Sequence, residues 1–229
     1  MTEIIPAIMP KTMRELGSSV SLVRGAATFV QIDVMDGKFV PETSWPFPNF
    51  DQTTAPFMQE VEGLPYWEEM GYEFDLMIKN PENYVEKFVC LGAERIIIHM
   101  ESASPERIKE AVAKTQALRT ETGLAIGVET SNEELEQFIN TDTTIDFVQF
   151  MGIARVGYQG EPFDERVIPK IKAFHEKHPD IIISVDGGVN FNSASLLVDT
   201  GVTRLVSGSA IFENGNPREA IRRLMSGGV

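Results

Sequence analysis

Two aspartates stand at the ends of short apolar segments, where their carboxyl groups could do chemistry. Asp33 lies in QIDVMDG, and Asp186 follows the apolar run IIISV in SVDGG. Burying a charge at the end of a strand costs free energy unless the charge has a partner, so a purely structural role is unfavourable for Asp33. The DGG sequence at Asp186 is also common in turns. Aspartates in such positions are candidates for acid–base or metal-binding roles.

The residues around Asp33 alternate in polarity. In an extended segment Gln31, Asp33 and Met35 project to one side, and the apolar residues between them project to the other. If the polar set faces inward, an amide and a carboxylate lie side by side inside the fold. Asp36 and Gly37, which follow, are explained as well by a turn that ends the strand as by a functional role.

Glycines follow the last two apolar segments. Gly187 and Gly188 come directly after Asp186, and Gly208 with Ser209 lies in VSGSA. Glycine lets the backbone approach a ligand closely, as phosphate-binding loops require. Together these two loops predict a phosphate site.

Eight apolar segments, spaced by amphipathic stretches, would position these residues. The segments are Glu3–Met9, Thr28–Val34, Glu73–Ile78, Arg95–His99, Leu124–Val128, Ile145–Met151, Ile181–Val185 and Thr203–Val206. Nearly continuous hydrophobic strands that alternate with helices are typical of a parallel sheet covered by helices. We expect one α/β domain over residues 1–229, a (β/α)8 TIM barrel; an open doubly wound sheet is the alternative. In such barrels active sites lie at the carboxyl ends of the strands, and the loops after strands 7 and 8 often bind phosphate.

The composition limits the kinds of molecule that the protein can bind and where it can be located. The formal net charge of −14 argues against a nucleic acid or an anionic membrane, but not against a small phosphorylated ligand. The single cysteine, Cys90, excludes an internal disulfide, and its setting predicts a buried position on a helix. The opening MTEIIPAIMP does not resemble a signal peptide, and no apolar run approaches the ~20 residues of a membrane span. We expect a cytoplasmic protein.

The chain resembles the ribulose-phosphate 3-epimerase family along nearly its whole length. The similar segments, in family order, are IDVMDGKFVP, DLMIKNP, LGAERIIIHME, VGYQGEPF, SVDGGV and GSAIF. The resemblance implies a ribulose-phosphate-binding TIM barrel that epimerises ribulose 5-phosphate to xylulose 5-phosphate at C3. It implies that Asp33 and Asp186 face opposite sides of C3 and transfer protons through an enediolate, one carboxyl ionised and the other protonated. It also implies a homo-oligomer.

The sequence departs from the family at the metal site. The family holds a divalent metal with two histidines and two aspartates, and Gln31 and Asp75 stand where the histidines are expected. Either the site is now Gln31, Asp33, Asp75 and Asp186, or metal binding is lost. Converging carboxylates need a counter-cation, which favours a metal; an all-oxygen shell prefers Mg²⁺ or Mn²⁺ over Zn²⁺ or Fe²⁺. The alternative is that the side chain of Arg155 or Lys79 supplies the counter-cation in place of a metal.

Barrel position and the resemblance together indicate substrate contacts. The expected residues are Met35, His99, Met151, Gly157, Gly160, Gly187, Gly188, Gly208 and Ser209. His99 could equally be a hydrogen-bonded core histidine, and the loop Pro41–Phe50 could be a lid, an oligomer contact or a packed loop.

Two other functions remain open. One is an epimerase or lyase for another sugar phosphate, such as a hexulose 6-phosphate, although no Asp-x-Lys-x-x-Asp motif ends a strand. The other is a non-catalytic barrel that binds a sugar phosphate.

Overall fold

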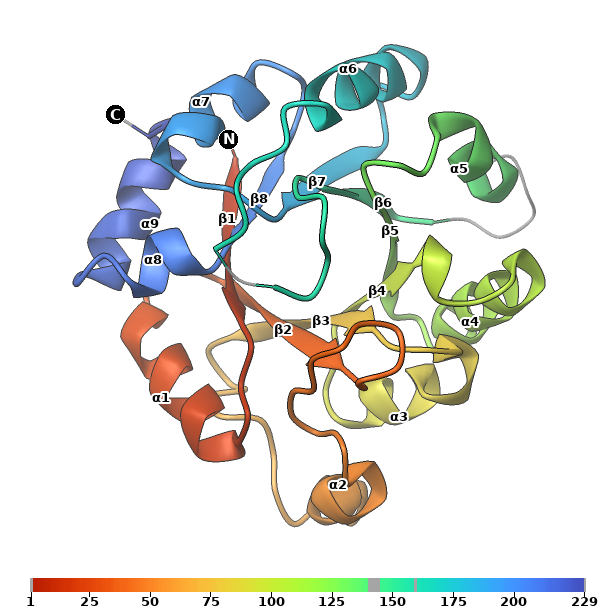
Figure 1. Cartoon of the computed structure of the whole chain (residues 1–229). Helices are drawn as coiled ribbons and strands as arrows, with labels where there is room; N and C mark the ends of the chain where they lie inside the picture. The colour runs from red at the N-terminus through yellow and green to blue at the C-terminus, as the bar shows by residue number, and fades with distance from the viewer. Residues whose placement is uncertain (1, 140–144, 159, 229) are drawn as a thin grey trace.

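The computed structural model describes residues 2–139, 145–158 and 160–228, and its centre is a closed barrel of eight parallel strands in sequence order (Figure 1). The strands are β1 Glu3–Ile8, β2 Phe29–Met35, β3 Gly71–Met77, β4 Arg95–His99, β5 Glu121–Ile126, β6 Phe147–Met151, β7 Ile182–Asp186 and β8 Arg204–Ser207. The last strand pairs with the first, so the described barrel has no free edge. The predicted TIM barrel is confirmed.

Helices surround the barrel (Figure 1). They are α1 Met13–Val23, α2 Phe50–Met58, α3 Val85–Cys90, α4 Pro105–Ala117, α5 Asn132–Ile139, α6 Val167–Lys177, α7 Phe191–Val198, α8 Ser209–Phe212 and α9 Pro217–Met225, with 3-10 turns η1 Pro81–Asn83 and η2 Met100–Ser102. The helical segment after Asn80 is divided into η1 and α3 because Tyr84, with φ −125°, leaves the helical conformation between them. No described helix is long and apolar enough to cross a membrane.

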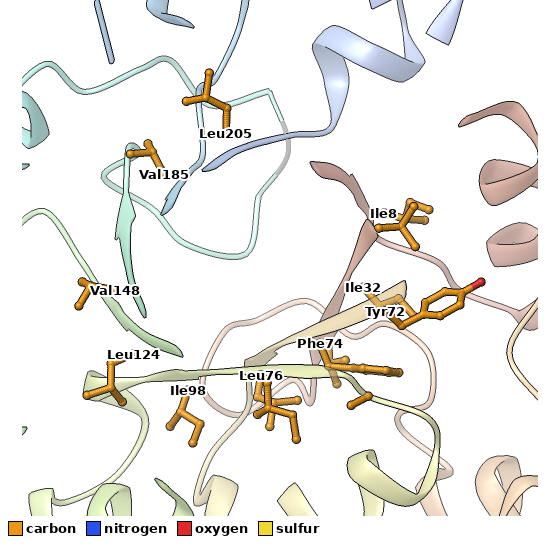
Figure 2. Close-up of a cluster of buried hydrophobic side chains, with 14 of the residues drawn as sticks. Ile8, Ile32, Tyr72, Phe74, Leu76, Ile98, Leu124, Val148, Val185 and Leu205 are labelled. Carbon is orange, nitrogen blue, oxygen red and sulfur yellow. The ribbon is translucent and has the colours of Figure 1, made fainter. Parts of the chain in front are cut away.

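The main core lies between the barrel and its helices. Figure 2 shows Ile32, Phe74, Ile98 and Val148 among the side chains that project outward from the strands. All four have no exposed surface, and burying a side chain of this size stabilises the fold by about 1.5–3 kcal/mol. Because side chains alternate along a strand, these apolar residues leave the neighbouring positions, such as Gln31 and Asp33, to point into the barrel.

The prediction that Cys90 is buried is wrong. Cys90 is exposed, whereas Val85 and Phe88 are fully buried. These two residues, three positions apart, share one face of α3 and pack against the barrel. Cys90 is two residues beyond Phe88 and therefore points about 200° away from that face.

Charged side chains fill the amino-terminal end of the barrel. Glu73 on β3 is 1% exposed, and its carboxylate lies 3.2 Å from the Arg95 guanidinium of β4. Arg95 also pairs with Glu3 and Glu121, and Arg204 on β8 pairs with the same two carboxylates. Burial raises the pKa of Glu73 to about 7, although Arg95 opposes the shift. This layer closes the end of the barrel opposite the strand ends that carry Asp33 and Asp186.

Glu73 should give the stability of the fold a pH dependence. Its folded pKa of about 7 exceeds its ordinary value of 4.5. Its contribution is therefore fully present below pH 4.5 and is lost as the pH rises through 7, by up to ~3 kcal/mol. Urea unfolding of the wild type and Glu73→Gln at pH 5 and pH 8 should show the variant gaining stability relative to the wild type at pH 8. A difference between the two proteins that does not change with pH would contradict this.

Candidate active site

Three carboxylates meet inside the carboxyl-terminal end of the barrel. Asp33 on β2 and Asp75 on β3 are cross-strand partners, and Asp186 comes from the end of β7. One oxygen from each of the three lies within 4.8 Å of the others. The parallel register places the strand ends at one level, and the closure of the barrel brings β7 opposite β2 and β3. Oxygens this close can share protons or surround a cation.

The Gln31 side chain joins two of these carboxylates. Its amide nitrogen donates to Oδ1 of Asp33 and to Oδ2 of Asp186, at 2.8 Å in each case. Its Oε1 is buried and has no hydrogen-bond partner among the described residues. Gln31 therefore acts in this arrangement as a donor that links the two proposed acid–base groups.

The third carboxylate, Asp75, has partners of its own. His99 Nε2 lies 2.9 Å from Asp75 Oδ1, so the hydrogen-bonded alternative for His99 agrees with the structure. Gln149 on β6 approaches Asp75 Oδ2 at 3.5 Å, and its own oxygen accepts from Ser184 at 3.2 Å. Gln149 and Ser184 were not expected from the sequence, although their positions at alternate, inward-facing sites of their strands could have revealed them.

Burial and mutual repulsion favour protonated carboxyls here. Burial, followed by the charges of Asp186 and Asp75, raises the pKa of Asp33 well above its ordinary range. Burial and the charge of Asp75 raise the pKa of Asp186 to about 7, although the hydrogen bond from Gln31 opposes the shift. Burial alone would lower the pKa of His99, but the Asp75 charge raises it overall. A carboxyl whose pKa lies near 7, as that of Asp186 does, suits proton transfer at neutral pH.

A pocket opens above Asp33 and Asp186. Most of the expected substrate-contacting residues border it, namely Met151, Gly157, Gly160, Gly187, Gly188, Gly208 and Ser209. Gln31, Asp75 and His99 have no exposed surface and form the layer beneath. Met35 differs: it is 1% exposed and packs with Met77 and Val40 instead of bordering the pocket. Figure 1 shows the loop between β6 and α6 lying over this end of the barrel.

The glycines after β7 are required by their surroundings. Gly187 and Gly188 have φ angles of +94° and +67°, which side chains rarely adopt. A Cβ on Gly188 would lie 2.5 Å from Cα of Phe163, and one on Gly187 would lie 2.7 Å from Ile153. The loop after β6 therefore packs directly on these glycines and holds their backbone against the pocket.

The turn after β2 has a structural role. Asp36 Oδ1 accepts from the amides of Lys38 and Phe39, and Oδ2 accepts from the amide of Lys79. Ser44 is buried, accepts from the amide of Met35 at 2.9 Å and donates to the carbonyl of Asp33 at 2.6 Å. The segment around Ser44 is thus a packed loop that fixes the end of β2.

Neither rival cation contacts the three carboxylates. Arg155 pairs with Glu161, and its guanidinium lies 5.0 Å from the Tyr158 ring centroid. Lys79 is exposed. The negative charge of the cluster is therefore not compensated by either side chain.

Fold and site define a class: an α/β barrel with closely spaced buried carboxyls beneath a glycine-bordered pocket after β7 and β8. The model of the ribulose-phosphate 3 epimerase family matches residues 3–212, and the chain belongs to that family. It is similar to the ribulose-phosphate 3-epimerase of Bacillus subtilis, at 29% identity over 98% of both chains. It is 32% identical to that of Chlamydia pneumoniae, over 91% of this chain and 86% of the relative.

Solved structures share the fold at lower identity. KGPDC from Streptococcus mutans, solved as a ligand complex, has a TM-score of 0.71 and 14% identity, over 99% of this chain and 96% of that one. The 3-hexulose-6-phosphate synthase of Salmonella typhimurium also has a TM-score of 0.71, at 12% identity, over 99% and 98% of the two chains. These likenesses establish the barrel and carry no argument about the reaction.

Replacing the linking amide should change the titration of the site. Gln31→Leu removes a donor that stabilises both ionised carboxyls, so the pKa of Asp186 should rise above its value of about 7. Titration of ¹³C-labelled aspartate carboxyls by NMR, in chelator-treated protein, would measure it. Gln52→Leu, an exposed position on α2, is the control. An Asp186 pKa that stays the same or falls would show that the amide does not hold this carboxyl.

Proposed function

We propose that this protein interconverts ribulose 5-phosphate and xylulose 5-phosphate by moving the proton at C3 between two aspartates. The observation that carries the proposal is the buried pair Asp33 and Asp186, which border one pocket and are linked by Gln31. Membership of the family and the names of the relatives support the substrate. We further propose a single barrel domain over residues 1–229, a cytoplasmic location and a homo-oligomer.

The two aspartates divide the proton transfer. The ionised carboxyl removes the C3 proton from one face, and the protonated carboxyl delivers a proton to the other face, so the configuration inverts. Raised pKa values for both groups support this division, because a shared, closely spaced pair keeps one proton near neutral pH. After each turnover the roles are exchanged, which the reverse reaction requires.

Backbone groups of the loops after β7 and β8 are proposed to hold the substrate phosphate. Gly187, Gly188, Gly208 and Ser209 border the pocket on the side of these loops. Backbone amides near the start of α8 can bind an anion although the whole protein is acidic. With the phosphate bound there, the reacting carbon would lie above the carboxyls.

The residues present fit a divalent metal with oxygen ligands. The oxygens of Asp33, Asp75 and Asp186 are close enough to surround one ion, and rotation of the Gln31 amide would bring its partnerless Oε1 toward them. A bound ion would polarise the C2 carbonyl and stabilise the enediolate charge. Without histidine or cysteine among these ligands, Mg²⁺ or Mn²⁺ is the expected ion.

Two alternative functions make different demands on the site. A non-catalytic binder would need the phosphate loops but not two buried carboxyls beside a pocket, and retaining them costs free energy. An epimerase or lyase for a longer sugar phosphate, such as a hexulose 6-phosphate, would use the same carboxyls. The choice of sugar can be tested by measuring whether the protein exchanges the C3 proton of each ketose phosphate with D₂O.

Single substitutions should separate the two proton transfers. Asp33→Asn and Asp186→Asn should each reduce epimerisation by about 10²–10⁴-fold, because each lacks one acid–base group. Each variant should still exchange the C3 proton of one epimer with D₂O, and the two variants should prefer opposite epimers. ¹H NMR of ribulose and xylulose 5-phosphates would measure this. Retention of full epimerisation by either variant would exclude that aspartate from the reaction.

The oxygen ligands should determine which divalent ion the site prefers. Chelator-treated protein titrated calorimetrically should bind Mn²⁺ and Mg²⁺, and the ratio of Zn²⁺ to Mn²⁺ affinity should rise at least ~10-fold in Gln31→His/Asp75→His. The ratio should rise because the two introduced histidines supply nitrogen ligands, which favour Zn²⁺. The oxygen-ligand site would be contradicted if the wild type bound none of the three ions, or if the ratio of Zn²⁺ to Mn²⁺ affinity were the same in the variant.

A further inference from the structure

The loop after β6 brings an unexpected acidic side chain to the pocket. Glu161 borders the same pocket as Gly187, Gly188 and the two aspartates, and its side chain is 16% exposed. Among the described residues that border this pocket there is no lysine or arginine. A phosphate dianion bound by the loops would therefore be repelled by the Glu161 carboxylate at close range.

Arg155 lies immediately behind this carboxylate. Its Nη2 donates to Oε1 of Glu161, and its Nε lies 3.4 Å from Oε2. The guanidinium also lies 5.0 Å from the ring centroid of Tyr158, which borders the pocket as well. The Arg155 side chain is 67% exposed. A guanidinium that does not itself border the pocket is thus held against two residues that do, the Glu161 carboxylate and the Tyr158 ring.

This ion pair can be exchanged at small cost. A pair with so exposed a partner contributes little to stability, because water solvates the charge and salt screens it. A phosphate dianion carries more charge than a carboxylate, and the planar guanidinium can donate two parallel hydrogen bonds to it. A phosphate at the mouth of the pocket is therefore a stronger partner for Arg155 than Glu161 is.

We propose that Arg155 is a phosphate-binding residue of this enzyme, held by Glu161 when the pocket is empty and transferred to the phosphate when substrate binds. The inference rests on the proposed function only in assuming that the ligand is a phosphorylated sugar. It assigns Glu161 the role of competitor for the guanidinium, which limits the affinity for phosphate.

The binding of inorganic phosphate, measured by isothermal titration calorimetry at low ionic strength, tests this without turnover. Arg155→Gln should weaken binding roughly tenfold or more, which corresponds to the loss of a charge-assisted hydrogen bond. Glu161→Gln should tighten binding, since it frees the guanidinium and removes a repelling charge. Arg166→Gln is the matched control, because Arg166 is also exposed and paired with carboxylates, those of Asp164 and Glu129; it should bind phosphate as the wild type does.

The double variant Arg155→Gln/Glu161→Gln tests whether Arg155 contacts the phosphate directly or affects binding only through the net charge near the pocket. It removes one positive and one negative charge, so the net charge near the pocket is unchanged. Direct contact predicts that it binds phosphate at least ~10-fold more weakly than Glu161→Gln, in which the same guanidinium is free to bind. Equal affinity of the double variant and Glu161→Gln would overturn the role of Arg155 and leave the phosphate site intact. Absence of phosphate binding by the wild type would instead overturn the phosphate site of the proposed function, together with this inference.

Discussion

The repulsion among three carboxylates buried at one end of a barrel is the constraint on which the site depends. Asp33, Asp75 and Asp186 cannot all be ionised there without a partner, because their charges are close and screened from water. The protein provides donors, Gln31 for two of them and His99 for the third. The remaining charge must be met by retained protons or by a cation, and both outcomes suit the proposed transfer of a proton next to a carbonyl.

The rest of the fold holds this unfavourable cluster in place. Outward-facing residues such as Phe74 and Ile98 are fully buried against the helices, so the strands cannot rotate to expose the carboxylates. Ser44 fixes the end of β2, and contact with the loop after β6 holds Gly188. A rigid frame of this kind allows polar groups to stay close together without the relaxation that would separate them.

How much the sequence predicted depends on whether a feature is local. Alternation of apolar residues sufficed for the barrel and for the inward direction of Gln31 and Asp33. The sequence predicts a strand from Leu124, but β5 begins at Glu121, which is in register with Arg95 of β4 and pairs with the side chains of Arg95 and Arg204. These partners come from other strands. Alternation along β6 could have placed Gln149 inward, but its contact with Asp75 of β3 is a contact between strands that the sequence does not show. Which end of the Gln31 amide faces the carboxylates follows from three-dimensional contacts alone.

The central claim is that the two aspartates exchange the C3 proton of a ketopentose phosphate with solvent. Incubation of the wild-type protein with ribulose 5-phosphate in D₂O, followed by ¹H NMR, tests it most directly. We predict that xylulose 5-phosphate forms with deuterium at C3, because the delivered proton comes from a carboxyl that has equilibrated with solvent. Binding of ribulose 5-phosphate with neither exchange nor epimerisation would contradict the account.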